Sequence, residues 1–171
     1  MYIEDKNFLT QEEKDVLEIC LTNSFPLYWK DQQTTVDNRP FLGHTLWDRE
    51  THLPCSNFCD FIENIVKKFC IKNNIEFKKI LRGSVNLSFP LNEEDYKPAA
   101  VHQDYDFDHN QMLIYLNDSD GDTVLYDKET KKITNRITPE KFKVICFNNV
   151  PHIGLGPTKS SRRVVIVICF N

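Results

Sequence analysis

The feature that most constrains the fold is a run of short strand-like segments that begins near residue 75 and reaches the C-terminus without a helical period. Residues 81–89 alternate strictly, with apolar residues or glycine at odd positions and polar residues at even positions. The other strands that we expect cover residues 99–102, 111–117, 123–126, 133–137, 143–147, 151–153 and 163–170. Parallel strands would need helical crossovers between them, so this pattern predicts an antiparallel sandwich or jelly roll.

Two helices are expected before the β region. The first covers about residues 11–22, and Thr10 with Glu13 has the sequence pattern of a capping box at its start. The second covers about residues 57–72, with Ser56 as its expected N-cap and apolar residues at three- and four-residue spacing. A helix with one apolar stripe needs a surface to cover, so we expect both helices to buttress the sheet.

The chain is therefore expected to be a single domain, residues 1–171, mainly β with N-terminal helices. Residues 1–75 would form a helical and irregular buttress, and residues 76–171 a double-stranded β-helix (jelly roll) of about eight strands. Within the buttress, residues 26–55 show no sustained period, and residues 41–47 are the best strand candidate there. Long irregular segments in compact domains are often functional covers.

Composition limits the class of protein. The net charge is −4, with 40% apolar and 27% charged residues, which is typical of a globular protein and offers no overall basic field for nucleic acid. The longest apolar run, residues 164–170, is far too short to span a membrane. The six cysteines form no C-x-x-C pair and the first residues show no signal-peptide pattern, so we expect reduced thiols and a cytoplasmic location.

The clearest chemical signal is a His-x-Asp triplet at the end of an expected strand. His102 and Asp104 form this triplet, and His152 follows fifty residues after His102. A jelly roll brings strands that are distant in sequence to one mouth, so the three side chains can meet. Two imidazoles and one carboxylate can occupy one face of an octahedral Fe(II) and leave the opposite face open. Each motif alone is weak evidence, but their order within an all-β region favours a metal site.

Other side chains crowd the same loop. Asp106 could replace Asp104 as the ligand, but the His-x-Asp spacing puts His102 and Asp104 on the same side of a strand end, which favours Asp104. We expect Tyr105, Asp106 and Phe107 to form the rim of a substrate site.

An arginine opens the last expected strand. Arg163 begins an alternation that continues with Val165 and Val167, so its side chain should point inward, whereas Arg162 would point to the other face and is the fallback candidate. A dicarboxylate that chelates iron through its 2-oxo acid end needs a fixed partner for its distant carboxylate, and a guanidinium offers two hydrogen bonds. Tyr115 can add a hydroxyl or serve only in packing.

Together, His102-x-Asp104, His152 and Arg163 resemble the signature of the Fe(II)/2-oxoglutarate-dependent dioxygenases. The resemblance implies that the two histidines and Asp104 hold Fe(II), and that 2-oxoglutarate and O2 take its open positions. It also implies oxidative decarboxylation of 2-oxoglutarate to succinate and CO2, coupled to hydroxylation of a C–H bond. The metal and the co-substrate supply this chemistry, and the protein supplies positioning and electrostatics.

The segment 114–125 resembles the prolyl 4-hydroxylase-like branch of this family. Its Tyr-Leu-Asn and Gly-Asp-Thr elements match that branch's pattern, except that Asp122 stands in place of the second glycine. In the branch, the tyrosine and the arginine that opens the last strand hold the tail of 2-oxoglutarate, which implies Tyr115 and Arg163 here. Most of residues 41–171 also resembles small stand-alone oxygenases of tailed phages.

The resemblance suggests a peptide or protein substrate, such as a proline side chain. Nucleic acid is not indicated by the net charge, but an oxygenase acting on nucleic acid or on a free amino acid is an alternative. A non-catalytic, cupin-like jelly roll that binds a metal or another ligand is a second alternative, and it leaves Arg163 and Tyr115 without a role. The sequence does not define the oligomeric state.

Overall fold

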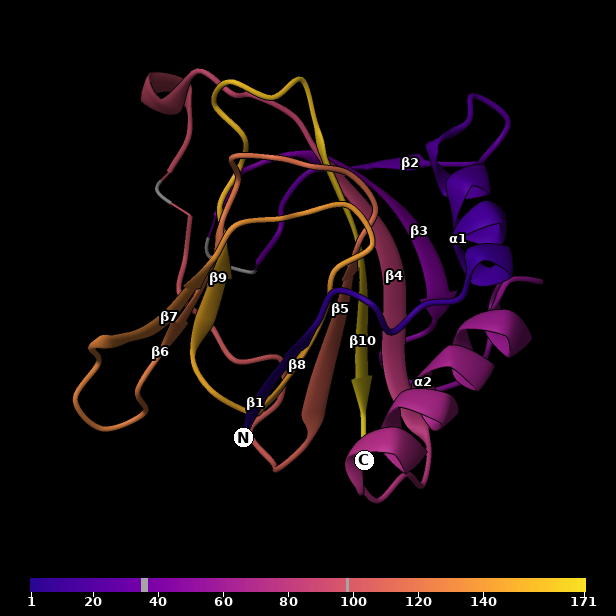
Figure 1. Cartoon of the computed structure of the whole chain (residues 1–171). Coiled ribbons are helices and arrows are strands. Elements are labelled where there is room, and N and C mark those ends of the chain that lie inside the picture. Colours follow the sequence, from indigo (N-terminus) through magenta and orange to yellow (C-terminus); the bar gives the residue numbers. More distant parts are fainter. Residues whose placement is uncertain (35–36, 98) are drawn as a thin grey trace.

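The computed structural model describes residues 1–34, 37–97 and 99–171 of the chain. Within these residues, ten strands form a seven-stranded and a three-stranded sheet, with two helices beside them (Figure 1). The strands are β1 (Tyr2–Asp5), β2 (Tyr28–Lys30), β3 (Phe41–Trp47), β4 (Ile80–Ser88), β5 (Asn110–Tyr115), β6 (Thr123–Tyr126), β7 (Ile133–Ile137), β8 (Val144–Asn148), β9 (His152–Gly154) and β10 (Arg163–Phe170). This confirms the mainly β jelly-roll class. The strands number ten rather than about eight, because seven of the eight expected strands form and β1, β2 and β3, from before residue 75, join the large sheet.

Strand β10 lies at the centre of the large sheet, whose order is β1-β8-β5-β10-β4-β3-β2, while the small sheet has the order β7-β6-β9. Every strand pairing is antiparallel. Alternate residues of β10 lie on opposite faces of the strand, in two different apolar clusters. Val164, Ile166 and Ile168 belong to the apolar cluster that includes the helices, whereas Val165 and Val167 belong to the cluster between the sheets. Burial on both faces explains why β10 is an uninterrupted apolar run after its first residue.

The helices are α1 (Gln11–Leu17), which continues as the 3-10 helix η1 (Glu18–Leu21), and α2 (Cys59–Asn73); a further short 3-10 helix, η2, covers Glu93–Asp95. Both α-helices lie on the β4 side of the large sheet (Figure 1), and their buried residues join the cluster that contains the outer face of β10. This is the expected buttress. No helix in the described ranges is long and apolar enough to cross a membrane. The six cysteines are all free, as expected.

Three expected boundaries were wrong. The first helix leaves α geometry after Leu17 because its last turn tightens to 3-10 bonding. Ser56 does not cap α2: Phe58 precedes the helix without a side-chain cap, and the Ser56 hydroxyl instead contacts His44 Nε2 at 2.8 Å. The expected strand 99–102 is reduced to one bridge, because in the described ranges only His102 of this segment has a strand partner, on β9.

The capping box at the start of α1 is present as predicted. Thr10 Oγ1 accepts from the Glu13 amide at 3.2 Å, and Glu13 Oε2 accepts from the Thr10 amide at 2.8 Å. Thr10→Ala should lower the free energy of unfolding by about 1 kcal/mol, because the substitution leaves a helix amide without its acceptor. Urea denaturation measures this, and Thr10→Ser should keep most of the stability. An unchanged midpoint for Thr10→Ala would show that α1 does not depend on its cap.

Candidate active site

The candidate site is an open cavity of about 640 Å³ that is lined by both sheets. Its walls come from β3, β4, β5 and β10 of the large sheet and from β6 and β9 of the small sheet. Four of the predicted site residues line it: His102, Asp104, His152 and Arg163. The fold therefore brings the candidate ligands and the candidate arginine to one cavity, although they are far apart in the sequence.

The two histidines are held by a backbone bridge. The His102 amide donates to the His152 carbonyl at 2.9 Å, the reverse bond measures 2.8 Å, and the ring centroids lie 4.6 Å apart. Each Nδ1 lies 3.0 Å from a carbonyl two residues earlier, that of Ala100 or Val150. A carbonyl can only accept, so Nδ1 carries the proton and Nε2 keeps its lone pair. Both rings are thus prepared to donate Nε2 to a metal.

Asp104 is the carboxylate beside them, and it is 4% exposed. Its Oδ1 accepts from Arg82 Nη1 at 2.6 Å, while Oδ2 lies 3.8 Å from His152 Nε2 and accepts from the Cys169 thiol at 3.4 Å. Burial raises the pKa of this carboxyl, but Arg82 and the two imidazoles outweigh burial and hold the pKa well below its usual range. Asp104 is therefore an ionised carboxylate with one oxygen, Oδ2, turned toward the histidines.

Arg163 is a buried cation that has no carboxylate within ion-pair distance in the described part of the chain. It is 6% exposed, and among the described residues it forms no ion pair. Its Nη2 donates to Thr123 Oγ1 at 2.9 Å, and Tyr115 donates to the same oxygen at 2.8 Å. Its Nε is buried without a hydrogen-bond partner in the described part of the chain. Burial lowers the pKa of Arg163, although Tyr115 and Asp122 oppose this effect, and a bound anion would offset the cost of burying the charge.

A glycine makes room for this arginine. A Cβ at Gly121 would lie 2.6 Å from the Leu155 carbonyl oxygen and 2.9 Å from Arg163 Cδ. Neither distance is tolerable for a side chain, so the loop before β6 can approach the guanidinium only with glycine at this position.

The other predicted residues are not among those that line the cavity. Arg162 is exposed, and Tyr115 is fully buried behind Thr123. Tyr105 stacks on Phe107 with ring centroids 4.8 Å apart, and neither of them nor the exposed Asp106 is among the residues that line the cavity. The described lining on that side comes instead from residues 30–34 and 41–49, a segment whose function the sequence did not reveal.

No family model and no curated protein matches the sequence. Solved structures do match: an oxidoreductase of the 2OG-Fe(II) oxygenase family from Burkholderia pseudomallei aligns with a TM-score of 0.72 over 99% of this chain and 84% of its own, at 15% identity. The chain has the fold of the 2OG-Fe(II) oxygenases. A Pseudomonas putida prolyl-4-hydroxylase aligns with a TM-score of 0.64 over 99% of this chain and 92% of its own, at 12% identity.

A third 2OG-Fe(II) oxygenase fold comes from Trichoplax adhaerens. This prolyl hydroxylase, solved with a hypoxia inducible factor oxygen degradation domain peptide fragment, aligns with a TM-score of 0.61 over 99% of this chain and 82% of its own, at 15% identity. The TM-scores establish a shared fold, and at these identities the likeness shows the fold alone. The resemblance to phage oxygenases stays a prediction.

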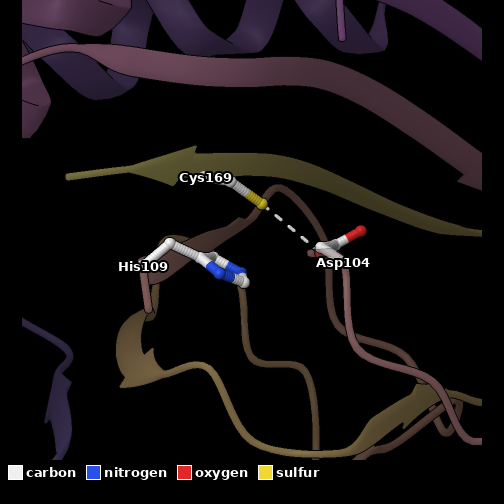
Figure 2. Close-up of side chains that lie close together, drawn as sticks. All are labelled: Asp104, His109 and Cys169. Carbon is white, nitrogen blue, oxygen red and sulfur yellow. Dashed lines mark hydrogen bonds between the residues drawn. The ribbon is translucent and has the colours of Figure 1, made fainter. Parts of the chain in front are cut away.

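Within the 2OG-Fe(II) oxygenase fold, sequence reasoning missed four residues. Thr123 connects Tyr115 to Arg163, and Arg82 holds Asp104. His109 and Cys169 lie beside Asp104, and the three possible ligand atoms fall within 4.8 Å of one another (Figure 2). Two of the four had a usable signal: Cys169 continues the inward alternation of Arg163, Val165 and Val167, and Arg82 lies on the polar face of an alternating strand.

The metal-free protein should lose stability as the pH falls from about 6.5 to about 4. Burial lowers the pKa of His152 to about 4, although Asp104 opposes this effect, and the unfolded value is about 6.5. Between these values the unfolded chain binds a proton that the folded chain does not, so the free energy of unfolding rises with pH across this window, by at most about 3 kcal/mol. Denaturation with a chelator present, at several pH values, measures the slope. His152→Gln should flatten this slope, and an unchanged slope would contradict the assignment of the effect to His152.

Proposed function

We propose that the protein is an Fe(II)- and 2-oxoglutarate-dependent oxygenase that hydroxylates a C–H bond of a protein side chain, such as proline. One observation carries the proposal: the cavity lined by two histidines and a carboxylate is also lined by Arg163, whose buried guanidinium forms no ion pair with any described residue. A simple metal-binding jelly roll would need the two histidines and the carboxylate but not the buried arginine. The pair suits a metal together with an anionic co-substrate.

The donor set fits Fe(II). His102 and His152 would supply Nε2 and Asp104 would supply Oδ2, since its other oxygen is held by Arg82. Three protein ligands of this kind leave positions open for a chelating co-substrate and for oxygen. Bound iron and 2-oxoglutarate would supply the oxidation, in which O2 is consumed, succinate and CO2 are released, and one oxygen atom enters the substrate's C–H bond.

The chain's own contribution is orientation. Arg163 would pair with the distant carboxylate of 2-oxoglutarate, and the Thr123 hydroxyl, held by Tyr115, would keep the guanidinium in place. The apolar side chains of Val165 and Val167 line the cavity between the arginine and the end of β10. A cavity of about 640 Å³ is within the usual range for a small ligand site, roughly 300–1,000 Å³.

A peptide substrate is supported by the Tyr115-Leu116-Asn117 resemblance to prolyl 4-hydroxylases. The Trichoplax adhaerens prolyl hydroxylase, which shares this fold, was solved with a peptide fragment. Mass spectrometry of a panel of proline-containing peptides, incubated with the loaded protein, should find a gain of one oxygen atom. A gain on a free amino acid or on nucleic acid, with none on peptides, would reject this substrate class while keeping the oxygenase.

Release of succinate from 2-oxoglutarate tests the activity. Wild-type protein with Fe(II), O2 and 2-oxoglutarate should form succinate slowly even without a substrate, and Asp104→Ala and His102→Ala should abolish it. Asp106→Ala is the matched control, because this exposed carboxylate lies in the same loop and should not be needed. Iron binding without succinate, with every substrate tried, would favour the cupin-like binding module. Loss of activity in Asp106→Ala but not in Asp104→Ala would show that the ligand is misassigned.

A further inference from the structure

Asp104 also belongs to a second group of possible metal ligands. Cys169 Sγ lies 3.4 Å from Asp104 Oδ2, and ligand atoms of Asp104, His109 and Cys169 all lie within 4.8 Å of one another. All three residues are buried: Asp104 is 4% exposed, His109 5% and Cys169 0%. Figure 2 shows the His109 ring, which comes from the residue just before β5, extending toward the gap between the thiol and the carboxylate. The group combines one imidazole, one thiol and one carboxylate.

His109 points to a missing partner at this place. Its Nδ1 lies 3.0 Å from the Phe107 carbonyl oxygen, so the ring proton is on Nδ1 and Nε2 carries a lone pair. That Nε2 is buried and has no hydrogen-bond partner in the described part of the chain. A buried acceptor without a donor is unfavourable, and a bound cation would satisfy its lone pair. Tyr105 and Phe107 pack around the ring with aromatic contacts and offer this nitrogen no donor.

We propose that His109, Cys169 and Asp104 bind a thiophilic divalent cation such as Zn²⁺. This position is distinct from that of the His102–Asp104–His152 triad. A mixed nitrogen, sulfur and oxygen set suits zinc, whereas Fe(II) is matched by the imidazole and carboxylate donors of the triad. Zinc ligand distances are about 2.0–2.3 Å, so atoms that lie within 4.8 Å of one another have to move closer together to share one ion. On binding, a zinc–sulfur bond replaces the sulfur–hydrogen bond of Cys169, and the proton passes to solvent.

The two metal positions exclude each other because they compete for one oxygen. Arg82 holds Asp104 Oδ1 at 2.6 Å, which leaves Oδ2, and Oδ2 lies 3.4 Å from Cys169 Sγ and 3.8 Å from His152 Nε2. Two divalent cations on this single oxygen would also face the nearby charges of Arg82 and Arg49. Zinc at the thiol position therefore draws Asp104 away from the triad and lowers its occupancy by iron.

Cobalt(II) chloride, added to metal-free, reduced protein without oxygen, is the direct probe. A cobalt–thiolate bond gives a strong near-ultraviolet charge-transfer band, which we expect in the wild type and in His102→Ala but not in Cys169→Ser. Cys55→Ser is the matched control, because Cys55 carries the exposed thiol that could bind cobalt adventitiously. A wild-type spectrum without a thiolate band would overturn the proposal, as would a band that survives Cys169→Ser. The experiment needs no turnover, so it stands apart from the test of the oxygenase.

A competition experiment keeps the proposal testable even if Cys169→Ser fails to fold. Wild-type protein loaded with Fe(II) and dialysed against ZnCl2 should lose iron, and His109→Gln should lose it at a zinc concentration at least about tenfold higher. Circular dichroism establishes that each variant is folded before it is compared. Equal iron loss from the wild type, Cys169→Ser and His109→Gln would show that zinc merely occupies the triad, and the second position would be rejected.

Discussion

Replacing Arg163 with alanine is expected to weaken 2-oxoglutarate binding by about 30-fold or more while metal binding is retained. Arg163 is buried and its Nε has no partner in the described part of the chain. Truncating one partner of a buried, hydrogen-bonded charge pair costs about 2–5 kcal/mol, and 2 kcal/mol corresponds to about 30-fold in affinity. Calorimetric titration of 2-oxoglutarate into Mn(II)-loaded protein measures the effect, and metal analysis of the same samples reports the occupancy of the metal site.

Two further variants make this result specific. Arg162→Ala removes the neighbouring exposed guanidinium and should leave the affinity for 2-oxoglutarate unchanged. Arg163→Lys keeps the charge but loses the planar pair of donors, so its affinity should fall between those of the wild type and of Arg163→Ala. A large loss in Arg162→Ala, with none in Arg163→Ala, would overturn the assignment of the inward-facing arginine.

The second large effect is expected from Arg82→Met in the metal-free protein. This substitution leaves the buried Asp104 carboxylate without the guanidinium at 2.6 Å and should lower the free energy of unfolding by about 3 kcal/mol. The value lies at the low end for a broken buried pair. Arg82 is 20% exposed in its side chain, and Arg49 Nη1, 3.6 Å from the same oxygen, can compensate in part. Urea denaturation at neutral pH with a chelator present measures the change.

A double-mutant cycle separates this ion pair from general packing. If Arg82 acts through Asp104, Arg82→Met combined with Asp104→Asn should cost clearly less than the sum of the two single changes. Lys67→Met serves as the surface control, because Lys67 and Glu63 form an exposed helical ion pair at 2.6 Å, and its loss should cost no more than about 0.5 kcal/mol. Additive effects of Arg82→Met and Asp104→Asn would contradict a positioning role.

The class of fold could be predicted because two physical patterns were strong. The absence of a helical period after residue 75 excluded crossover helices, and the two amphipathic helices needed a sheet to cover. Of the extra strands, β3 matches the candidate at residues 41–47, whereas β1 and β2 have no alternating pattern that would define them. Residues 28–30 form β2 with every residue exposed, and residues 2–5 form β1 without a regular alternation, because an edge strand is defined by backbone pairing rather than by burial.

Part of the candidate site could be predicted because it follows strand alternation. The inward direction of Arg163, Val165 and Val167 was predicted from the two-residue alternation of side chains along a strand. The structure places all three on the cavity wall. The polar face of β4 had a signal that was not used: polar residues such as Arg82 and Ser84 on a central strand must face a polar cavity rather than solvent. The partners Thr123 and His109 depend on loop conformation and tertiary packing, which a single sequence does not encode locally.

The proposed function requires Fe(II) and 2-oxoglutarate to meet in one cavity, and an anaerobic optical titration tests this directly. Wild-type protein with both Fe(II) and 2-oxoglutarate should develop a weak visible charge-transfer band, because a 2-oxo acid that chelates iron shares electron density with it. Fe(II) alone should give no band, and neither should Asp104→Ala with both components. Wild-type protein that binds Fe(II) and 2-oxoglutarate but shows no band would contradict the proposed arrangement of His102, Asp104, His152 and Arg163.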